Sequence, residues 1–90
     1  MAQSYTVVLL REEDGGYSVV VPALPGCFTQ GSTVPEALER AKEAMRCHLE
    51  AMQADGDPIP PDVTKVSFDW EDATEAVVYK VMLQEAAPVA

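Results

Sequence analysis

Residues 14–50 read DGGYSVVVPALPGCFTQGSTVPEALERAKEAMRCHLE and contain a strand, a turn and a helix start in close succession. The β-branched and aromatic run at 17–21 favours a β-strand. Pro25 and Gly26 supply the fixed φ and then the positive φ that the central positions of a type II turn require, so the chain reverses there. We expect residues 27–30 to follow as a short third strand.

A capping box marks the start of the helix that comes next. Thr33 and Glu36 have the Thr-x-x-Glu spacing, with Pro35 in the first turn, where its missing N–H costs nothing. Apolar residues then recur at three- and four-residue steps, as in a helix that packs one face on a core. They are Val34, Ala37, Leu38, Ala41, Ala44, Met45, Leu49 and Met52. We expect the helix to end near Ala54, with Gly56 as its terminator.

Upstream, residues 5–12 read YTVVLLRE and predict a β-hairpin with 17–21, closed at Asp14-Gly15 by a tight primed turn. If the turn has an even number of residues, both faces of the hairpin are apolar. One face then carries Val8, Leu10, Tyr17, Val19 and Val21, and the other carries Tyr5, Val7, Leu9 and Val20. A lone antiparallel sheet usually exposes one polar face to solvent. Because both faces here are apolar, we expect another element or another subunit to cover the second face.

After the helix, residues 57–62 read DPIPPD, and the three prolines predict an extended spacer. Residues 65–70 alternate in polarity and predict either an edge strand or an ordered arm. Residues 76–84 predict the last strand. The expected fold class is α+β: an antiparallel three-stranded sheet, one long helix and a returning C-terminal strand, in the order β-β-β-α-β, within a single domain at 1–90.

The chain is strongly acidic. Fifteen Asp and Glu against six Lys and Arg give it a formal net charge of −9. Such a field repels phosphate backbones and anionic membranes and attracts basic partners. We therefore expect no direct nucleic-acid ligand and no membrane contact, and we expect any partner to be a basic protein.

The remaining composition limits the cellular setting. No apolar stretch approaches the roughly 20 residues of a spanning helix, and the N-terminus lacks the basic and apolar segments of a signal peptide. We expect a cytoplasmic protein. Cys27 and Cys47 fit no metal or redox spacing, so we expect reduced thiols, with an incidental disulfide as the alternative.

Several short motifs between residues 5 and 60 are shared with one protein family. They are the acidic Gly-Gly-Tyr hairpin at 14–17, the Val-Pro-x-Leu-Pro-Gly-Cys turn at 21–27, the Thr-x-Gly-x-Thr run at 29–33, the Glu-Ala-Leu helix start at 36–38 and the Ile-Pro pair at 59–60. Together they closely resemble the HicB family of bacterial antitoxins. The resemblance implies a partly ribonuclease-H-like arrangement of the sheet, helix and returning strand.

The resemblance also implies a partner. HicB antitoxins commonly pair with HicA, a small basic toxin that cleaves mRNA, and block its active surface. Longer members append a helix-turn-helix or ribbon-helix-helix domain, whereas this chain ends at Ala90, so it resembles the short branch. For that branch, a solitary homodimer or homotetramer is the alternative to a toxin-bound antitoxin.

The acidic hairpin is the candidate partner-binding site. It consists of Glu12, Glu13, Asp14 and Tyr17, which join exposed carboxylates to an aromatic side chain that can anchor an interface. The alternative interpretation is an ordinary solvated turn. Phe68 and Trp70 follow the proline spacer. We expect their side chains either to form an intersubunit arm or to pack in the core of the same chain.

An enzymatic alternative is a degenerate ribonuclease-H-like hydrolase that depends on a divalent metal. Its candidate ligands are Glu12, Glu13, Asp14, Asp69, Glu71 and Asp72. Asp in a hairpin turn has a backbone role, so we favour a solvated acidic loop. His48 has no serine or acid at a triad-like spacing, and nothing local supports a Cys27–His48 pair. We therefore expect no catalytic residue, metal or cofactor.

Overall fold

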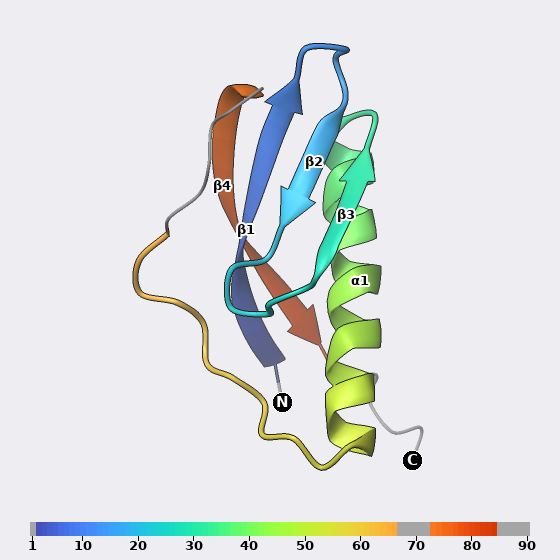
Figure 1. Cartoon of the computed structure of the whole chain (residues 1–90), viewed down its shortest axis with the longest axis vertical. Helices are drawn as coiled ribbons and strands as arrows, with labels where there is room; N and C mark the ends of the chain where they lie inside the picture. Colours follow the sequence, from blue (N-terminus) through green and yellow to red (C-terminus); the bar gives the residue numbers. More distant parts are fainter. Residues whose placement is uncertain (1, 67–72, 85–90) are drawn as a thin grey trace.

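A computed structural model describes residues 2–66 and 73–84 of the chain. The elements follow one another as β1 (Ala2–Glu12), β2 (Tyr17–Val20), β3 (Phe28–Gly31), α1 (Val34–Ala54) and β4 (Ala73–Gln84). The strands form an antiparallel sheet in the order β3-β2-β1-β4, so the returning strand lies beside the first one (Figure 1). The predicted α+β class and element order are confirmed.

The two strands β1 and β4, which pair with each other, are longer than predicted. Ala2 pairs with Gln84, and the ladder between β1 and β4 continues to Glu12 and Ala73, with an irregularity between Arg11 and Glu12. Each strand therefore begins three residues earlier than its sequence signal. Residues 65 and 66 form no strand, and the rest of the predicted edge strand or ordered arm at 65–70, with Phe68 and Trp70, lies outside the described residues.

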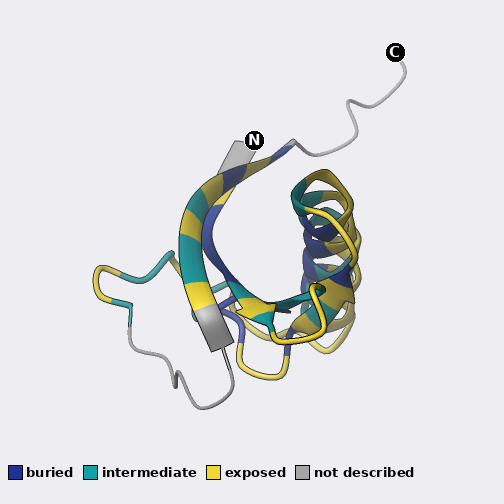
Figure 2. Ribbon diagram, turned by 90° about the horizontal axis from the view of Figure 1, so that it is seen from above, coloured by how far each residue is buried: buried dark blue, intermediate teal, exposed yellow. Residues whose placement is uncertain are grey.

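The helix covers one face of the sheet, which curves partly around it (Figure 2). Ala37, Ala41, Met45 and Leu49 are the buried residues of α1, as the apolar periodicity predicted. They meet side chains from β1, β2 and β4 in one core. Its members are Tyr5, Val7, Leu9, Val19, Val21, Ala23, Leu24, Cys27, Ala37, Ala41, Met45, Leu49, Val81 and Leu83.

The predicted hairpin register is wrong by one residue. The loop contains three residues, 13–15, and is closed by hydrogen bonds from the Glu12 N–H to the Gly16 carbonyl (2.8 Å) and from the Gly15 N–H to the Glu12 carbonyl (3.0 Å). Gly15 has φ +94°, which lets an odd-numbered loop close where a primed two-residue turn was expected.

This register moves side chains between the faces, because a one-residue slip inverts the pleat. Leu9 pairs with Val19, and both face α1, whereas Val8 pairs with Val20 on the opposite face, here called the outer face. The helix-facing side therefore combines Val19 and Val21 with Tyr5, Val7 and Leu9.

The turn at Pro25-Gly26 and the helix N-cap read from the sequence are confirmed. The Cys27 N–H donates to the Leu24 carbonyl (2.9 Å) across Pro25 and Gly26, and Gly26 has φ +86°. Thr33 Oγ1 accepts from the Glu36 N–H (3.2 Å) at the start of α1.

The helix ends in a Schellman motif, which explains the role of Gly56. Its N–H donates to the Gln53 carbonyl (3.1 Å), and the Asp57 N–H donates to the Met52 carbonyl (2.9 Å). Gly56 takes φ +76°, which a residue with a Cβ adopts only at a cost.

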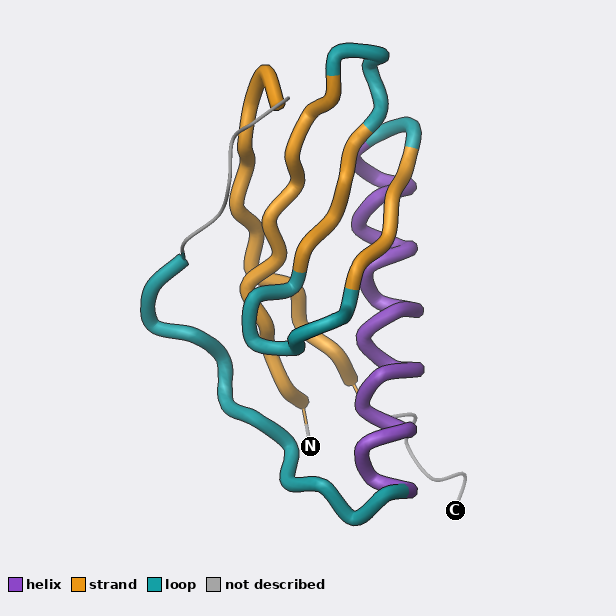
Figure 3. Tube along the Cα trace, in the orientation of Figure 1, coloured by secondary structure: helices purple, strands orange, loops and turns teal. Residues whose placement is uncertain are grey.

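The proline-rich connector after α1 runs along the outer side of the sheet, away from the helix (Figures 2 and 3). The Tyr5 hydroxyl donates to the Pro60 carbonyl (2.6 Å). The Asp62 carboxylate accepts from the Thr6 N–H and the Thr6 hydroxyl, both at 2.9 Å, and pairs with Lys80. Because β2 pairs with β1 only from Val8 onward, Asp62 takes the place of a strand partner at Thr6.

Asp62 is an unusually acidic carboxyl group. Partial burial by itself would raise its pKa, but hydrogen bonds from Lys80, from the backbone and hydroxyl of Thr6 and from the Val63 N–H lower the pKa to about 2. These donors favour the charged form, so the carboxylate stabilises the connector over a wide pH range.

Replacing Asp62 tests this contact. We expect Asp62→Asn to lower the free energy of unfolding at neutral pH by about 2 kcal/mol, since a charged acceptor of several hydrogen bonds is lost. The folded-state pKa lies below the ordinary value of 3.8, so the stabilisation is present above that pH and disappears as the pH falls toward about 2. Urea unfolding of both proteins at a series of pH values measures the difference. Asp57→Asn, the same change at an exposed position, should have little effect; an equal loss for both variants would contradict the role of Asp62.

Candidate functional site

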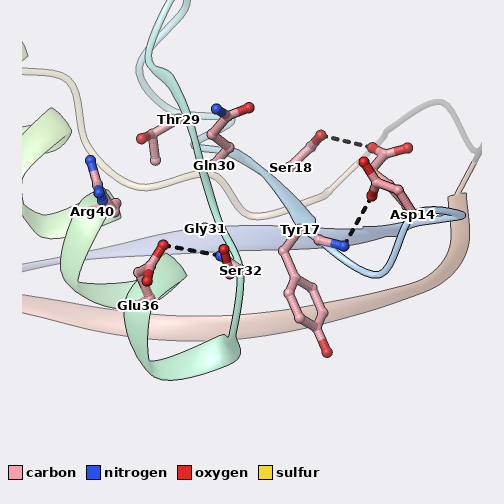
Figure 4. A pocket seen from close by; sticks show the side chains of 11 residues that line it. Asp14, Tyr17, Ser18, Thr29, Gln30, Gly31, Ser32, Glu36 and Arg40 are labelled. Atoms are coloured by element: carbon pink, nitrogen blue, oxygen red, sulfur yellow. Dashed lines mark hydrogen bonds between the residues drawn. The ribbon is translucent and has the colours of Figure 1, made fainter.

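An open depression of about 480 Å³ lies at the hairpin end of the sheet (Figure 4). Three segments that are separate in the sequence form it: the β1–β2 hairpin, the edge strand β3 and the first turns of α1. The lining residues are Glu12, Asp14, Gly16, Tyr17, Ser18, Thr29, Gln30, Gly31, Ser32, Glu36 and Arg40. Three carboxylates and one guanidinium make this a polar site with an acidic balance.

The structure brings three of the four predicted partner-binding residues to this depression. Glu12, Asp14 and Tyr17 line it, whereas the exposed Glu13 belongs to the hairpin loop but not to the lining. Asp14 Oδ1 accepts from the Gly16 N–H (3.0 Å), and Glu12 Oε1 accepts from the Ser18 hydroxyl (2.7 Å). Two carboxylates are therefore fixed by local hydrogen bonds, while Glu13 projects from the tip.

Tyr17 lies on the other side of the strands from Glu12. It pairs with Arg11 and Gly31 and packs, half-buried, against the core, whereas the Ser18 hydroxyl points in the opposite direction (Figure 4). A partner that contacts both the aromatic ring and the carboxylates must therefore reach around the end of the sheet.

The second wall of the depression was missed by sequence reasoning. It is built by β3 and the start of α1, where Glu36 Oε1 accepts from the Ser32 N–H (3.1 Å). The two elements meet closely at Gly31: a Cβ there would lie 2.6 Å from the Ala37 backbone nitrogen. The glycine in the Thr-x-Gly-x-Thr run was the available signal, because a glycine often marks a close approach of two backbones.

The proposed metal ligands do not form a cluster within the described residues. In residues 2–66 and 73–84, no three His, Cys, Asp or Glu side chains lie close enough together to hold a metal ion. Asp69, Glu71 and Asp72 lie outside these ranges. Glu12 and Asp14 are instead engaged by a hydroxyl and a backbone N–H.

The thiols and the histidine do not form a nucleophilic pair in the part of the chain that is described. Both cysteines are free; Cys27 is buried and Cys47 exposed. Burial, with a further contribution from Cys47, raises the pKa of the Cys27 thiol and keeps it in its weakly nucleophilic protonated form. His48 is half-exposed on α1 and shares no hydrogen bond with Cys27. In the same described residues, α1 lacks the apolar length needed to cross a membrane.

The amino-acid sequence matches known antitoxins and their relatives. A family model described as "HicB_like antitoxin of bacterial toxin-antitoxin system" matches residues 5–86. A UPF0150 protein of Thermoplasma acidophilum is 53% identical over 58 residues, which cover 64% of this chain and 84% of that protein. Antitoxin HicB 1 of Photorhabdus laumondii is 38% identical over 82 residues, 91% of this chain, and the match spans 52% of that antitoxin.

Two solved structures share the fold. One is the crystal structure of the N-terminal domain of Burkholderia pseudomallei antitoxin HicB, with a TM-score of 0.64, 22% identity and coverage of 88% of this chain and 95% of that chain. The other is the HicA3 and HicB3 toxin-antitoxin complex, in which one chain matches with a TM-score of 0.59, 19% identity and coverage of 91% and 96%. At these identities the likeness concerns the architecture of sheet and helix.

Proposed function

Because this chain belongs to the HicB-like antitoxin family, we propose that it is a non-enzymatic antitoxin that binds and masks a basic, HicA-type mRNA-cleaving toxin. The single observation that carries this assignment is the family match over residues 5–86. The fold it shares with a chain of the HicA3 and HicB3 complex supports the choice of toxin class. We further propose that the antitoxin acts in the cytoplasm as a homodimer or homotetramer, which is also the form expected for a solitary relative without a toxin.

Charge supports a basic partner. The net charge of −9 speeds encounter with a cationic protein and disfavours direct binding to RNA. The acidic hairpin concentrates this charge in three consecutive carboxylates at Glu12, Glu13 and Asp14. An antitoxin of this kind competes with RNA for the cationic surface of the ribonuclease, so masking requires no chemistry of its own.

The hairpin is the proposed contact surface for the toxin. Glu13 is exposed and Tyr17 is half-buried beside the depression. A partner that reaches around the end of the sheet would find an aromatic anchor on one side, at Tyr17, and the carboxylates on the other, and aromatic anchors are common in binding hot spots. The depression between the hairpin and α1 offers space for a protruding basic side chain of the toxin.

Reversing the charge of Glu13 tests this surface without removing a contact that stabilises the folded chain. We expect Glu13→Lys to weaken binding to a HicA-type toxin about tenfold at low salt, mainly through slower association. The toxins tested are any short basic protein encoded beside the gene and, as a surrogate, HicA3, and both affinity and inhibition of RNA cleavage are measured. The difference should shrink when the ionic strength rises from about 50 mM to about 300 mM, because exposed charges are screened.

Glu43→Lys is the matched control, since it makes the same charge change at an exposed position on α1. It should weaken binding about twofold or less, through net charge alone. Equal effects of the two variants would remove the hairpin from the interface. Failure of the unaltered protein to bind either toxin at micromolar concentration and low salt would contradict the proposed antitoxin function.

A further inference from the structure

The outer face of the sheet exposes large apolar side chains. Phe28, Val78 and Met82 are 67%, 51% and 58% exposed, and the strand pairings place all three on this face. Phe28 pairs with Val20, Val20 with Val8, and Val8 with Val78, so one apolar row crosses all four strands. We call these four residues the outer row.

Burial within the row is uneven. Val8 at its centre is fully buried although it is not part of the core under α1, whereas the two ends of the row, Phe28 and Val78, are open. Met82 extends the apolar surface along β4. Soluble monomers seldom leave several large apolar side chains open on one face, and such a patch marks an interaction site.

We propose that this outer face binds a second copy of the same chain, through the outer row and Met82. The surface specifies the proposed homo-oligomer, and it is separate from the proposed toxin contact at the hairpin. A symmetric contact covers the exposed Phe28, Val78 and Met82 of both copies at once, which is how a self-complementary patch forms a dimer.

Charge decides in favour of a second copy over a basic toxin. Among the described strand residues of the outer face, the ionisable side chains are one carboxylate, Glu12, and one ammonium, Lys80. Both are engaged: Glu12 accepts from Ser18, and Lys80 pairs with Asp62 of the connector.

The consequence follows from the distribution of the remaining charge. With Asp62 of the connector included, the named charged groups of this face are two carboxylates and one ammonium, a small part of the net charge of −9, so a second acidic chain meets little repulsion there. The face offers a cationic toxin little attraction. The two proposed surfaces therefore differ in character: the apolar outer row and Met82 suit a second copy, and the acidic hairpin, which contributes Glu12 to the same face, suits a basic protein.

The test is the oligomeric state of the full chain carrying Val78→Glu and Met82→Glu, measured by sedimentation velocity from about 1 to about 200 µM. We expect the unaltered protein to form dimers or tetramers, and the double variant to dissociate at least about a hundredfold more readily. The neutral double variant Val78→Thr, Met82→Thr keeps strand-compatible residues and should weaken association about tenfold. Circular dichroism verifies that each variant is folded.

Ala51→Glu with Gln53→Glu is the matched control, because it adds the same two charges at exposed positions of α1. It should remain associated. A monomeric unaltered protein at the highest concentration, or a folded Val78→Glu, Met82→Glu variant that associates like the control, overturns the proposed interface.

Toxin binding by the same variants separates the two proposals. If the unaltered protein is monomeric and the Val78→Glu, Met82→Glu variant loses toxin binding, the outer face is the contact surface for the toxin. Association through this face in a protein that binds no toxin would leave the interface standing and reject the antitoxin function.

Discussion

Gly31→Ala is expected to lower the free energy of unfolding by about 3 kcal/mol, at the upper end of the usual cost of overpacking. A Cβ at this position would lie 2.6 Å from the backbone nitrogen and 2.7 Å from the Cα of Ala37. Both atoms belong to the helix backbone, so no side-chain rotation can relieve the overlap, and β3 must move away from α1. Equilibrium unfolding in urea measures the loss.

Gly16→Ala is the control for this prediction. Its Cβ would meet Asp14 Oδ1 at 3.5 Å and the Gly31 carbonyl oxygen at 3.6 Å, which are ordinary contacts. We expect a change within about 0.5 kcal/mol, as for a surface substitution. A similar cost at both glycines would show that the close approach of β3 to α1 does not determine the requirement at Gly31.

The same substitution should also alter the candidate site. Gly31, Ser32 and Glu36 line the depression, so displacement of α1 from β3 changes the wall opposite the hairpin. Toxin binding by Gly31→Ala is therefore informative only at a temperature where the variant is fully folded.

Met45→Ala is expected to cost about 3 kcal/mol, within the range for removal of a buried methionine side chain. Met45 is fully buried on the helix face that meets the sheet. Alanine is the strongest helix former, so the loss reports packing and not helix propensity. Thermal or urea unfolding provides the measurement.

Met52→Ala makes the same chemical change about two turns later on α1, where the side chain is only partly buried. We expect a cost of about 1 kcal/mol, in proportion to the smaller apolar area removed from water. If the two substitutions lower the free energy of unfolding by the same amount, the packing of α1 differs from that described.

The candidate site was predictable where it depends on neighbours in the sequence. The carboxylates and the aromatic ring of the hairpin were identified because Asp-Gly-Gly-Tyr has the composition of a turn followed by a strand. The opposite wall was not, because its proximity depends on how closely β3 approaches α1. Whether Glu12 and Tyr17 share a face also required the register, and they do not.

Interactions between residues no more than about five positions apart in the sequence determined much of this fold. The φ preferences of Pro25 and Gly26 dictate the turn, the Thr33–Glu36 spacing starts the helix, and Gly56 ends it, all through contacts within one or two turns of chain. The apolar periodicity of α1 identified its buried face for the same reason. These are local free-energy preferences that act before any tertiary structure forms.

Tertiary structure alone decided the features that join distant segments. The hairpin register depended on whether two or three residues close the loop, and that choice placed Val19, and not Val20, on the same face of the sheet as Leu9. The Asp62 carboxylate meets Thr6 across 56 positions of sequence, and β4 extends to Ala73 because β1 is there to pair with it. No local preference encodes such contacts: each forms only when the packed sheet brings its two halves within hydrogen-bonding distance.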